Sequence, residues 1–253
     1  MNKLQNKRVL ITGGGQGLGQ AIVEQFIGAG ADVAIHYHSS KTGAEQLKTV
    51  AVQAGRKAEI FQADLTQEAA AAGLVKAAAK FLGGLDVLVN NAGDMIGRRR
   101  LEEVDGAFWE KVISVNVTSM MWVTQAAVPE LIKAGQSSIV NLSSLAGRKG
   151  GHAGSLVYST AKGAVLTWTR ALANELGPKG VRVNALAPGL ILGTRFHSTH
   201  TTDESAQATI QQIPLGRAGS PEDIARVAVF LASEYDGFIT GATIDINGGV
   251  YAA

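Results

Sequence analysis

The sequence predicts an α/β domain in which a doubly wound parallel sheet of about seven strands spans residues 1–253. Short apolar runs alternate with amphipathic helical patterns along nearly the whole chain, and this alternation is typical of parallel sheets covered by helices on both faces. The first apolar run ends in a cluster of glycines that opens a helix. No linker or internal repeat interrupts the alternation, so a single domain is expected.

Composition limits the classes of protein to which the chain can belong. Hydrophobic residues make up 46% and charged residues 17%, which is a globular composition. The 23 Lys and Arg nearly balance the 21 Asp and Glu, so no nucleic-acid partner is expected. The absence of cysteine excludes disulfides, thiolate metal sites and cysteine nucleophiles. The N-terminus is polar and no apolar run approaches the ~18 residues that span a bilayer, so we expect a cytoplasmic protein with no membrane association. We also expect no metal.

The first element is a buried strand over 8–12 that ends in a glycine-rich turn, TGGGQGLG at 12–19. The helix that follows is ended by Gly28 and Gly30. A strand, a glycine-rich turn and a helix direct helix N–H groups at a phosphate and let a pyrophosphate approach closely. A tight turn without a ligand is the alternative. The turn residues expected to bind a nucleotide are Gly13, Gln16, Gly17, Leu18 and Gly19.

The second strand, 32–37, indicates which dinucleotide binds. Its carboxyl end should reach the adenosine ribose, where an acidic residue would select NAD. Tyr37, His38, Ser39, Ser40 and Lys41 stand there instead. These residues include no carboxylate to repel a 2′-phosphate, and their hydroxyl, imidazole and ammonium groups can bind one. We therefore expect NADP(H) to be preferred, with NAD(H) as the alternative.

The third and fourth strands bring polar and small residues to the same edge of the sheet. A helix over 44–54 precedes a strand at 59–62, and Asp64 and Leu65 follow that strand. The Asp64 carboxylate can accept a hydrogen bond from adenine or cap the next helix, 67–81. The fourth strand, 85–89, runs into NNAG at 90–93, where small and amide side chains suit a loop beside a flat cofactor.

Residues 104–134 carry one long helical pattern with a break near 117–118, and Asn116 lies inside it. An asparagine within a helix is usually solvent-facing or at a local kink. A fifth strand at 138–142 delivers Ser143 and Ser144. A glycine-rich loop is expected over 147–155, before a helix over 158–176.

Tyr158 and Lys162 are four residues apart, so they lie one turn from each other on one face of that helix. A free phenol has a pKa near ~10, and a neighbouring ammonium lowers this pKa by favouring the phenolate. Such a tyrosine can pass a proton to or from an oxygen, and a serine hydroxyl nearby can hold that oxygen. The same spacing occurs by chance on many helix surfaces, so the hypothesis depends on the other motifs.

The last third of the chain completes the sheet. A sixth strand at 181–186 precedes the sharp Pro188-Gly189 turn. Residues 190–213 are polar, threonine-rich and weakly periodic, and we expect them to form a mobile lid or substrate loop. Ser220 and Pro221 predict the start of a helix, and residues 241–246 form the last strand.

In this order, the motifs resemble the classical short-chain dehydrogenase/reductase family, whose members have a Rossmann fold, over essentially the whole chain. Each match is weak alone, but their order on the predicted elements makes the resemblance specific. The matches are TGGGQGLG at 12–19, Asp64, NNAG at 90–93, Asn116, Ser144, YSTAK at 158–162, PG at 188–189 and DINGG at 245–249. The resemblance implies hydride transfer between a nicotinamide cofactor and a carbonyl or secondary alcohol.

The resemblance also implies roles for single residues. Tyr158 would be the general acid for reduction or the base for oxidation, and Lys162 would bind the nicotinamide ribose and lower the tyrosine pKa. Ser144 would hydrogen-bond the reacting oxygen, with Ser143 as its rival, and Asn116 would hold a water in a proton relay. The cofactor-binding residues expected are Gly13, Gln16, Gly17, Leu18, Gly19, Tyr37, His38, Ser39, Asp64, Leu65, Asn90, Ala92, Gly93, Tyr158, Lys162, Pro188, Gly189 and Ile191.

The substrate is less well specified by the sequence. Cationic residues follow the fourth, fifth and sixth strands, namely Arg98, Arg99, Arg100, Arg148, Lys149, His152, Arg195, His197 and His200. They favour an anionic substrate such as a carboxylate, unless they are surface charges or subunit contacts. The segments NNAGDMIGRRRLEEVD at 90–105, SLAGRKGGHAGSLVY at 144–158, TRFH at 194–197 and DINGGVY at 245–251 resemble those of reductases of keto-deoxy uronates formed in alginate breakdown. This narrower resemblance implies a small keto or sugar acid as substrate.

Other activities stay open at this point. Family members also reduce 3-oxoacyl groups on carrier proteins or oxidise sugars and polyols. A dinucleotide-sensing regulator without turnover is an alternative of a different class, which the complete set of Ser144, Tyr158 and Lys162 argues against. Because family members are usually tetramers, we expect a homotetramer with interfaces on the helices at 105–134 and 157–176.

Overall fold

A seven-stranded parallel sheet forms the centre of the computed structural model, which describes residues 4–233 and 237–252. The strand order β3-β2-β1-β4-β5-β6-β7 reverses direction between β1 and β4, so the predicted doubly wound Rossmann-like fold is confirmed. The strands are β1 (Arg8–Ile11), β2 (Asp32–Tyr37), β3 (Ala58–Gln62), β4 (Val87–Asn90), β5 (Ser137–Leu142), β6 (Val181–Pro188) and β7 (Thr243–Ile246).

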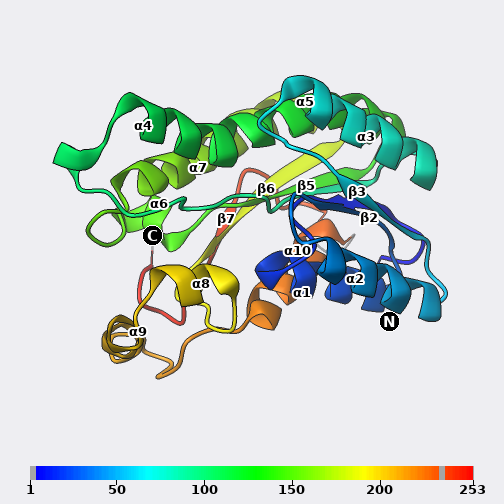
Figure 1. The fold of residues 1–253 in the computed structure, drawn as a ribbon. Helices are drawn as coiled ribbons and strands as arrows, with labels where there is room; N and C mark the ends of the chain where they lie inside the picture. The colour runs from blue at the N-terminus through cyan, green and yellow to red at the C-terminus, as the bar shows by residue number, and fades with distance from the viewer. Residues whose placement is uncertain (1–3, 234–236, 253) are drawn as a thin grey trace.

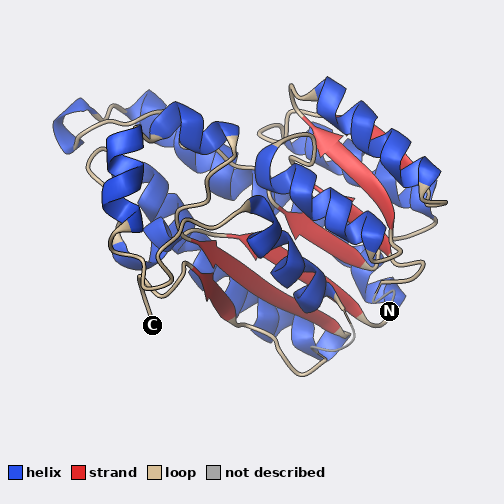
Figure 2. Cartoon of the chain, turned by 90° about the horizontal axis from the view of Figure 1, so that it is seen from below, coloured by secondary structure: helices blue, strands red, loops and turns tan. Residues whose placement is uncertain are grey.

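Helices cover both faces of this sheet (Figures 1 and 2). One face packs on α1 (Gly17–Gly28), α2 (Lys41–Gln53) and α10 (Pro221–Ala232). The other face packs on α3 (Glu68–Leu82), α5 (Ser119–Ala134) and α7 (Leu156–Leu176). Each face has its own apolar core, so every central strand is buried on both sides and its carboxyl end is the part left open to a ligand.

The long helical pattern at 104–134 is divided into three pieces. A 3-10 turn at Leu101–Glu103 precedes α4 (Gly106–Ile113), and a π-helical turn, Ser114–Thr118, separates α4 from α5. The break therefore falls where the sequence placed it. Asn116 lies inside the π turn, a distortion that often marks a functional position.

Two segments expected to be loops contain helices. The serine that follows β5 opens α6 (Leu145–Lys149), so the glycine-rich loop is shorter than predicted and covers only 150–155. The polar segment 190–213 contains α8 (Arg195–His200) and α9 (Asp203–Ile210). Thr194 and Thr202 are their N-caps, with Oγ1 accepting from the N–H groups of His197 and Ser205. The expected lid or substrate loop therefore contains two short helices, which the sequence reasoning missed because they depend on these threonine caps.

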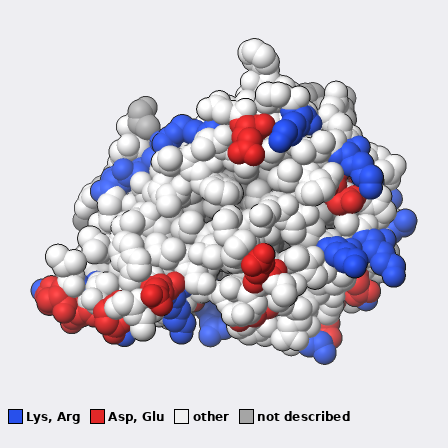
Figure 3. Space-filling model, turned by 90° about the horizontal axis from the view of Figure 1, so that it is seen from above, with Lys and Arg blue, Asp and Glu red and all other residues white. Residues whose placement is uncertain are grey.

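The surface over the helices drawn uppermost in Figure 1 has charged side chains at its margin and few in its centre (Figure 3). Exposed apolar side chains on these elements include Trp109 of α4 and Leu156 at the start of α7. Within the described ranges, no helix combines the length and the apolar character needed to cross a membrane.

Candidate functional site

A cavity of about 470 Å³ opens at the carboxyl ends of the strands. Ser144 and most of the predicted cofactor-binding residues line it. The cofactor-binding predictions in its wall are Gly13, Gln16, Gly17, Leu18, Gly19, His38, Ser39, Asp64, Leu65, Ala92, Gly93, Tyr158, Lys162, Pro188, Gly189 and Ile191. Residues from opposite ends of the chain are brought together because the ends of parallel strands share one edge of the sheet.

Two predicted cofactor residues have side chains outside this cavity. Tyr37 is 6% exposed and packs in the apolar core. Because strand side chains alternate between faces, its neighbours His36 and His38 line the cavity instead. The Asn90 amide donates to Thr124 and to Asn141 inside the protein. Asn91 is the asparagine of the NNAG motif that lines the cavity, whereas the sequence prediction named Asn90.

The glycine-rich turn is packed so closely that side chains would not fit. A Cβ on Gly19 would overlap the carbonyl oxygen of Gly13, and a Cβ on Gly15 would overlap Ser40. Asn91 braces the turn by donating to the carbonyls of Thr12 and Gly13 at 2.9 and 3.0 Å. Since α1 begins at Gly17, its unpaired first N–H groups lie in the cavity wall. This cradle fits the pyrophosphate of a dinucleotide.

His36 connects the glycine-rich turn to the third strand, a role that sequence reasoning missed. Its Nδ1 accepts from the Gly13 N–H at 3.0 Å, and its Nε2 lies 3.1 Å from the Ala63 carbonyl oxygen. These two partners require a neutral ring with its proton on Nε2. Burial lowers the pKa of His36 to about 4, so the neutral form is kept. A polar residue inside the otherwise apolar strand at 32–37 was the available signal.

Asp64 follows β3 and lines the same part of the cavity. One carboxylate oxygen accepts from the Thr66 N–H at 3.0 Å and from the Thr66 hydroxyl at 2.7 Å. These bonds lower the pKa of Asp64, so the group is anionic. The N-cap of α3 is Gln67, so Asp64 forms a local turn and does not cap the helix.

Tyr158 and Lys162 lie in the first two turns of α7 and are both buried. The Lys162 ammonium donates to the Leu142 carbonyl at 2.8 Å and lies 5.7 Å from the centre of the Tyr158 ring. Burial lowers the pKa of Lys162 to about 8 and raises that of Tyr158 above its usual value, while an interaction with Ser144 partly offsets the second shift. The tyrosine pKa is therefore raised and not lowered as expected, because desolvation is the largest effect and Lys162 is not among the groups that shift this pKa.

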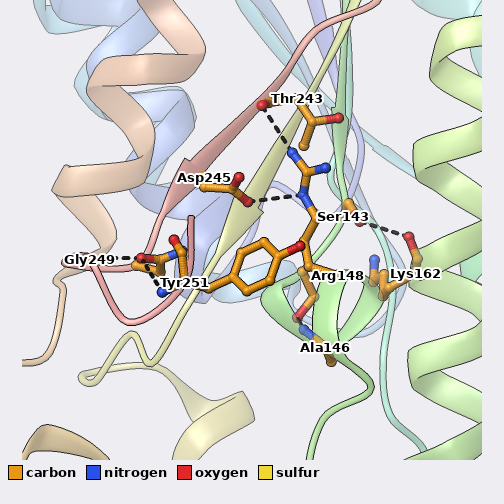
Figure 4. A network of polar contacts seen from close by, with 10 residues as sticks. Ser143, Ala146, Arg148, Lys162, Thr243, Asp245, Gly249 and Tyr251 are labelled. Atoms are coloured by element: carbon orange, nitrogen blue, oxygen red, sulfur yellow. Dashed lines mark hydrogen bonds and ion pairs between the residues drawn. The ribbon is translucent and has the colours of Figure 1, made fainter. Parts of the chain in front are cut away.

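The two serines after β5 have different surroundings. Ser143 Oγ donates to the Lys162 carbonyl at 2.7 Å and thereby ties the strand end to α7 (Figure 4). Ser144 is the N-cap of α6, and its Oγ accepts from the Ala146 N–H at 3.1 Å. That hydroxyl can still donate a hydrogen bond, so Ser144 is the serine available to a reacting oxygen.

Asn116 does not line the cavity but lies directly behind it. Its Nδ2 donates to the carbonyls of Val112 and Asp94 at 2.9 and 2.6 Å, and its Oδ1 accepts from the Asp94 N–H at 3.2 Å. A Cβ added to Gly93 would lie 2.7 Å from Asn116 Oδ1 and 3.1 Å from Lys162 Nζ. Both polar atoms therefore face the same point beside the Gly93 backbone.

A second cavity of about 120 Å³ adjoins the first. Six residues line both cavities. Two of them, Ser144 and Tyr158, carry the hydroxyls expected to contact the reacting oxygen. The shared residues are Ser144, Tyr158, Pro188, Gly189, Phe196 and His197. The Phe196 ring lies 5.8 Å from the Tyr158 ring, so α8 forms part of the wall at this junction. The lining of the smaller cavity includes Arg98, Lys149 and His152 and no acidic residue.

A family model described as enoyl-(acyl carrier protein) reductase matches residues 13–251. The chain belongs to the classical short-chain dehydrogenase/reductase family. It is therefore an oxidoreductase that acts on CH–OH or C=O groups, and a nicotinamide cofactor fits the cradle described above. Among the described residues, no group of three or more His, Cys, Asp or Glu is placed to hold a metal ion.

Similar proteins cover nearly the whole chain. A 3-oxoacyl-[acyl-carrier-protein] reductase of Aquifex aeolicus is 38% identical over 98% of this chain and 99% of its own. The solved structure of an NADH-dependent reductase, A1-R′, responsible for alginate metabolism is 32% identical with a TM-score of 0.90, covering 100% of both chains. A short-chain dehydrogenase of Burkholderia cenocepacia in complex with NADP is 32% identical with a TM-score of 0.91, covering 99% of this chain and 100% of its own.

The bridge made by His36 predicts a pH dependence of stability. Since its folded pKa of about 4 is below the usual 6.5, the unfolded chain binds more protons between these values. The contribution of His36 to the free energy of unfolding should therefore be complete above pH 6.5. It should decrease by about 3 kcal/mol as the pH falls toward 4. His36→Asn should make the fall shallower in urea unfolding measured from pH 4 to 7.

His152, which is exposed, provides the matched control. His152→Asn should leave the pH dependence of the unfolding free energy as in the wild type. An identical pH dependence in His36→Asn and the wild type would show that His36 is not the titrating group.

Proposed function

We propose that the chain is an NADPH-dependent reductase of a small carbonyl compound that carries a carboxylate, such as a keto acid or sugar acid. The observation that supports this most is the junction of the two cavities. The larger cavity has the glycine cradle for the dinucleotide, the smaller one has a cationic lining, and the Ser144 and Tyr158 hydroxyls lie where the two meet.

The residues at the junction have distinct tasks in this proposal. A bound reduced nicotinamide supplies the hydride. Ser144 donates a hydrogen bond to the carbonyl oxygen and orients it. Tyr158 donates the proton that the oxygen acquires, and its raised pKa keeps the phenol protonated until then. The Lys162 ammonium, held by the Leu142 carbonyl, stabilises the phenolate that Tyr158 becomes. Asn116 holds a relay water that returns a proton to Tyr158 and Lys162.

Removing the Tyr158 hydroxyl tests this assignment. Tyr158→Phe should lower kcat by about 10²–10⁴-fold, the usual contribution of a positioned general acid, and leave the NADPH dissociation constant nearly unchanged. Tyr37→Phe is the matched control, because Tyr37 is also buried but lies outside both cavities. Stopped-flow measurement of NADPH oxidation together with fluorescence titration gives both quantities. Retained turnover in Tyr158→Phe would contradict the assignment of the Tyr158 hydroxyl as the proton donor.

The reaction itself is tested by a screen with NADPH and NADH against aldehydes, ketones, keto acids and 3-oxoacyl thioesters. The proposal expects oxidation of NADPH with small keto acids. Turnover of carrier-bound 3-oxoacyl groups alone, or of neutral sugars and polyols alone, would support those alternatives. Tight NADPH binding without turnover of any compound would support a dinucleotide-sensing regulator.

The preference for NADPH is argued from the end of β2. His38, Ser39 and Ser40 line the cavity there, and no carboxylate follows the strand. The N-terminus of α2 begins at Lys41, so its dipole favours an additional phosphate at this point. The similar solved structures are described with NADH in one case and NADP in another, so family membership does not decide the choice.

Cofactor preference can be measured and reversed. The wild-type kcat/KM should be higher with NADPH than with NADH. His38→Asp should reverse that order, because a carboxylate repels the 2′-phosphate and accepts hydrogen bonds from ribose hydroxyls. Ser39→Ala, which adds no charge, is the control and should keep the preference. Equal kcat/KM values with both cofactors in the wild type would contradict the proposal.

Most cations near the site are already paired or neutral, which limits those that can bind an acidic substrate. Arg148 pairs with Asp245, and Arg99 pairs with Asp105. The pKa of His197 is lowered to about 4 by burial, so this ring is neutral. Arg98 lines the smaller cavity, but its guanidinium donates to the carbonyls of His200 and Ala153.

Lys149 lines the smaller cavity and is exposed, and among the described residues no acidic side chain pairs with its ammonium. Lys149→Met should raise KM for keto acids by about tenfold or more and leave KM for neutral ketones unchanged, because only the acids lose an ionic partner. Lys133→Met, on the outer surface of α5 and paired with Glu130, is the control. An unchanged KM for keto acids would contradict this role.

We also propose that the chain assembles as a homotetramer through α4, α5 and α7. The surface in Figure 3, over the helices drawn uppermost in Figure 1, has few charged side chains in its centre. Trp109 of α4 is 42% exposed and Leu156 of α7 is 47% exposed. Large apolar side chains beside a charged margin are typical of subunit interfaces.

A further inference from the structure

The short helix α6 carries the proposed oxygen-binding serine at its start. Ser144 Oγ accepts from the Ala146 N–H, and the helix ends five residues later at Lys149. A helix of this length is not stable on its own, because its few internal hydrogen bonds do not offset the cost of nucleation. Contacts with neighbouring elements must therefore determine where the Ser144 hydroxyl lies.

Two elements hold α6 from opposite sides. On one side, a Cβ added to Gly147 would lie 2.6 Å from the Lys162 carbonyl carbon, so α6 and α7 touch backbone to backbone. On the other side, Arg148 reaches across to β7 (Figure 4). Its Nε donates to Asp245 Oδ1 at 3.0 Å, and its Nη2 donates to the Thr243 carbonyl at 3.2 Å.

The contact with β7 is directional and largely shielded from solvent. The side chains of Arg148 and Asp245 are only 15% and 18% exposed, unlike a surface ion pair. Two donors of one planar guanidinium engage two acceptors on the same strand, so the bond fixes the orientation of Arg148 as well as its distance. Arg148 lines neither cavity, so it has no contact of its own with a substrate.

We propose that Arg148 is a positioning residue that acts through Ser144. By clamping the last turn of α6 to β7, it fixes the first turn of the same helix and thereby the direction of the Ser144 hydroxyl. This inference rests on the proposed function, because it assumes that Ser144 binds the reacting oxygen.

A double-mutant cycle tests whether Arg148 acts through Ser144. Arg148→Met should lower kcat for the accepted ketone by about 10–100-fold, as expected for a misplaced catalytic group, and leave the NADPH dissociation constant within about twofold. Arg148→Lys should restore part of kcat. In a Ser144→Ala background, Arg148→Met should cost less than about threefold, since the group it positions is gone.

Hydrogen exchange of the free protein gives a second measurement that needs no substrate. Arg148→Met should increase deuterium uptake over 146–150, which covers α6 after its first residue and the C-cap Gly150. Arg8→Met is the matched control, because Arg8 pairs with Asp86 at 2.8 Å at the opposite end of the sheet, with side chains 29% and 13% exposed. It should lower the melting temperature but change neither kcat nor the exchange of 146–150.

Each outcome decides the proposal. An equal loss of kcat with and without Ser144, or unchanged exchange over 146–150 in Arg148→Met, would overturn it. If the wild type reduces no compound tested, the proposed function fails. The exchange result then decides separately whether Arg148 holds α6.

Discussion

The burial of one face of α7 against the end of β5 is the constraint on which the rest of the site depends. It places the Lys162 ammonium on the Leu142 carbonyl and holds Tyr158 one turn away. The same contact is reinforced by the Ser143 hydroxyl on the Lys162 carbonyl, and by Gly147, whose missing side chain lets α6 touch α7. Ser144 and the α8 residue Phe196 are then arranged around the Tyr158 ring.

This burial also explains the electrostatics of the pair. Desolvation disfavours the charged form of each group, so it lowers the pKa of Lys162 to about 8 and raises that of Tyr158. In the proposed reaction the protonated phenol is the proton donor, and the Lys162 ammonium beside it offsets part of the cost of forming the phenolate. The topology supplies the second requirement, since the carboxyl ends of β1, β4, β5 and β6 meet around one cavity.

The doubly wound parallel sheet could be predicted from the sequence because it follows from the alternation of strands and helices. The glycine-rich turn and the residues Ser144, Tyr158 and Lys162 were found from local patterns, and the structure brings them to one cavity. The sequence did not locate side chains whose direction depends on tertiary packing. Tyr37 and Asn90 point into the core. Their sequence neighbours His36 and Asn91 line the cavity where Tyr37 and Asn90 were expected.

Helices α6 and α8 were missed for a related reason. Each has only five or six residues, too few for a hydrophobic period to appear, and each depends on a capping hydroxyl and on neighbouring elements. The contact between Arg148 and Asp245 joins residues 97 positions apart, so no reading of local sequence reveals it. The cations near the smaller cavity were visible in the sequence, but only the structure separates those with partners from Lys149.

The central claim is that a carbonyl oxygen is bound at the junction of the two cavities by the Ser144 and Tyr158 hydroxyls. A crystal structure with NADPH and an unreactive alcohol analogue of an accepted substrate tests it most directly. The account predicts that the alcohol oxygen lies within hydrogen-bonding distance of both hydroxyls, with the remainder of the analogue in the smaller cavity. An analogue bound with its oxygen away from Ser144 and Tyr158 would contradict the account.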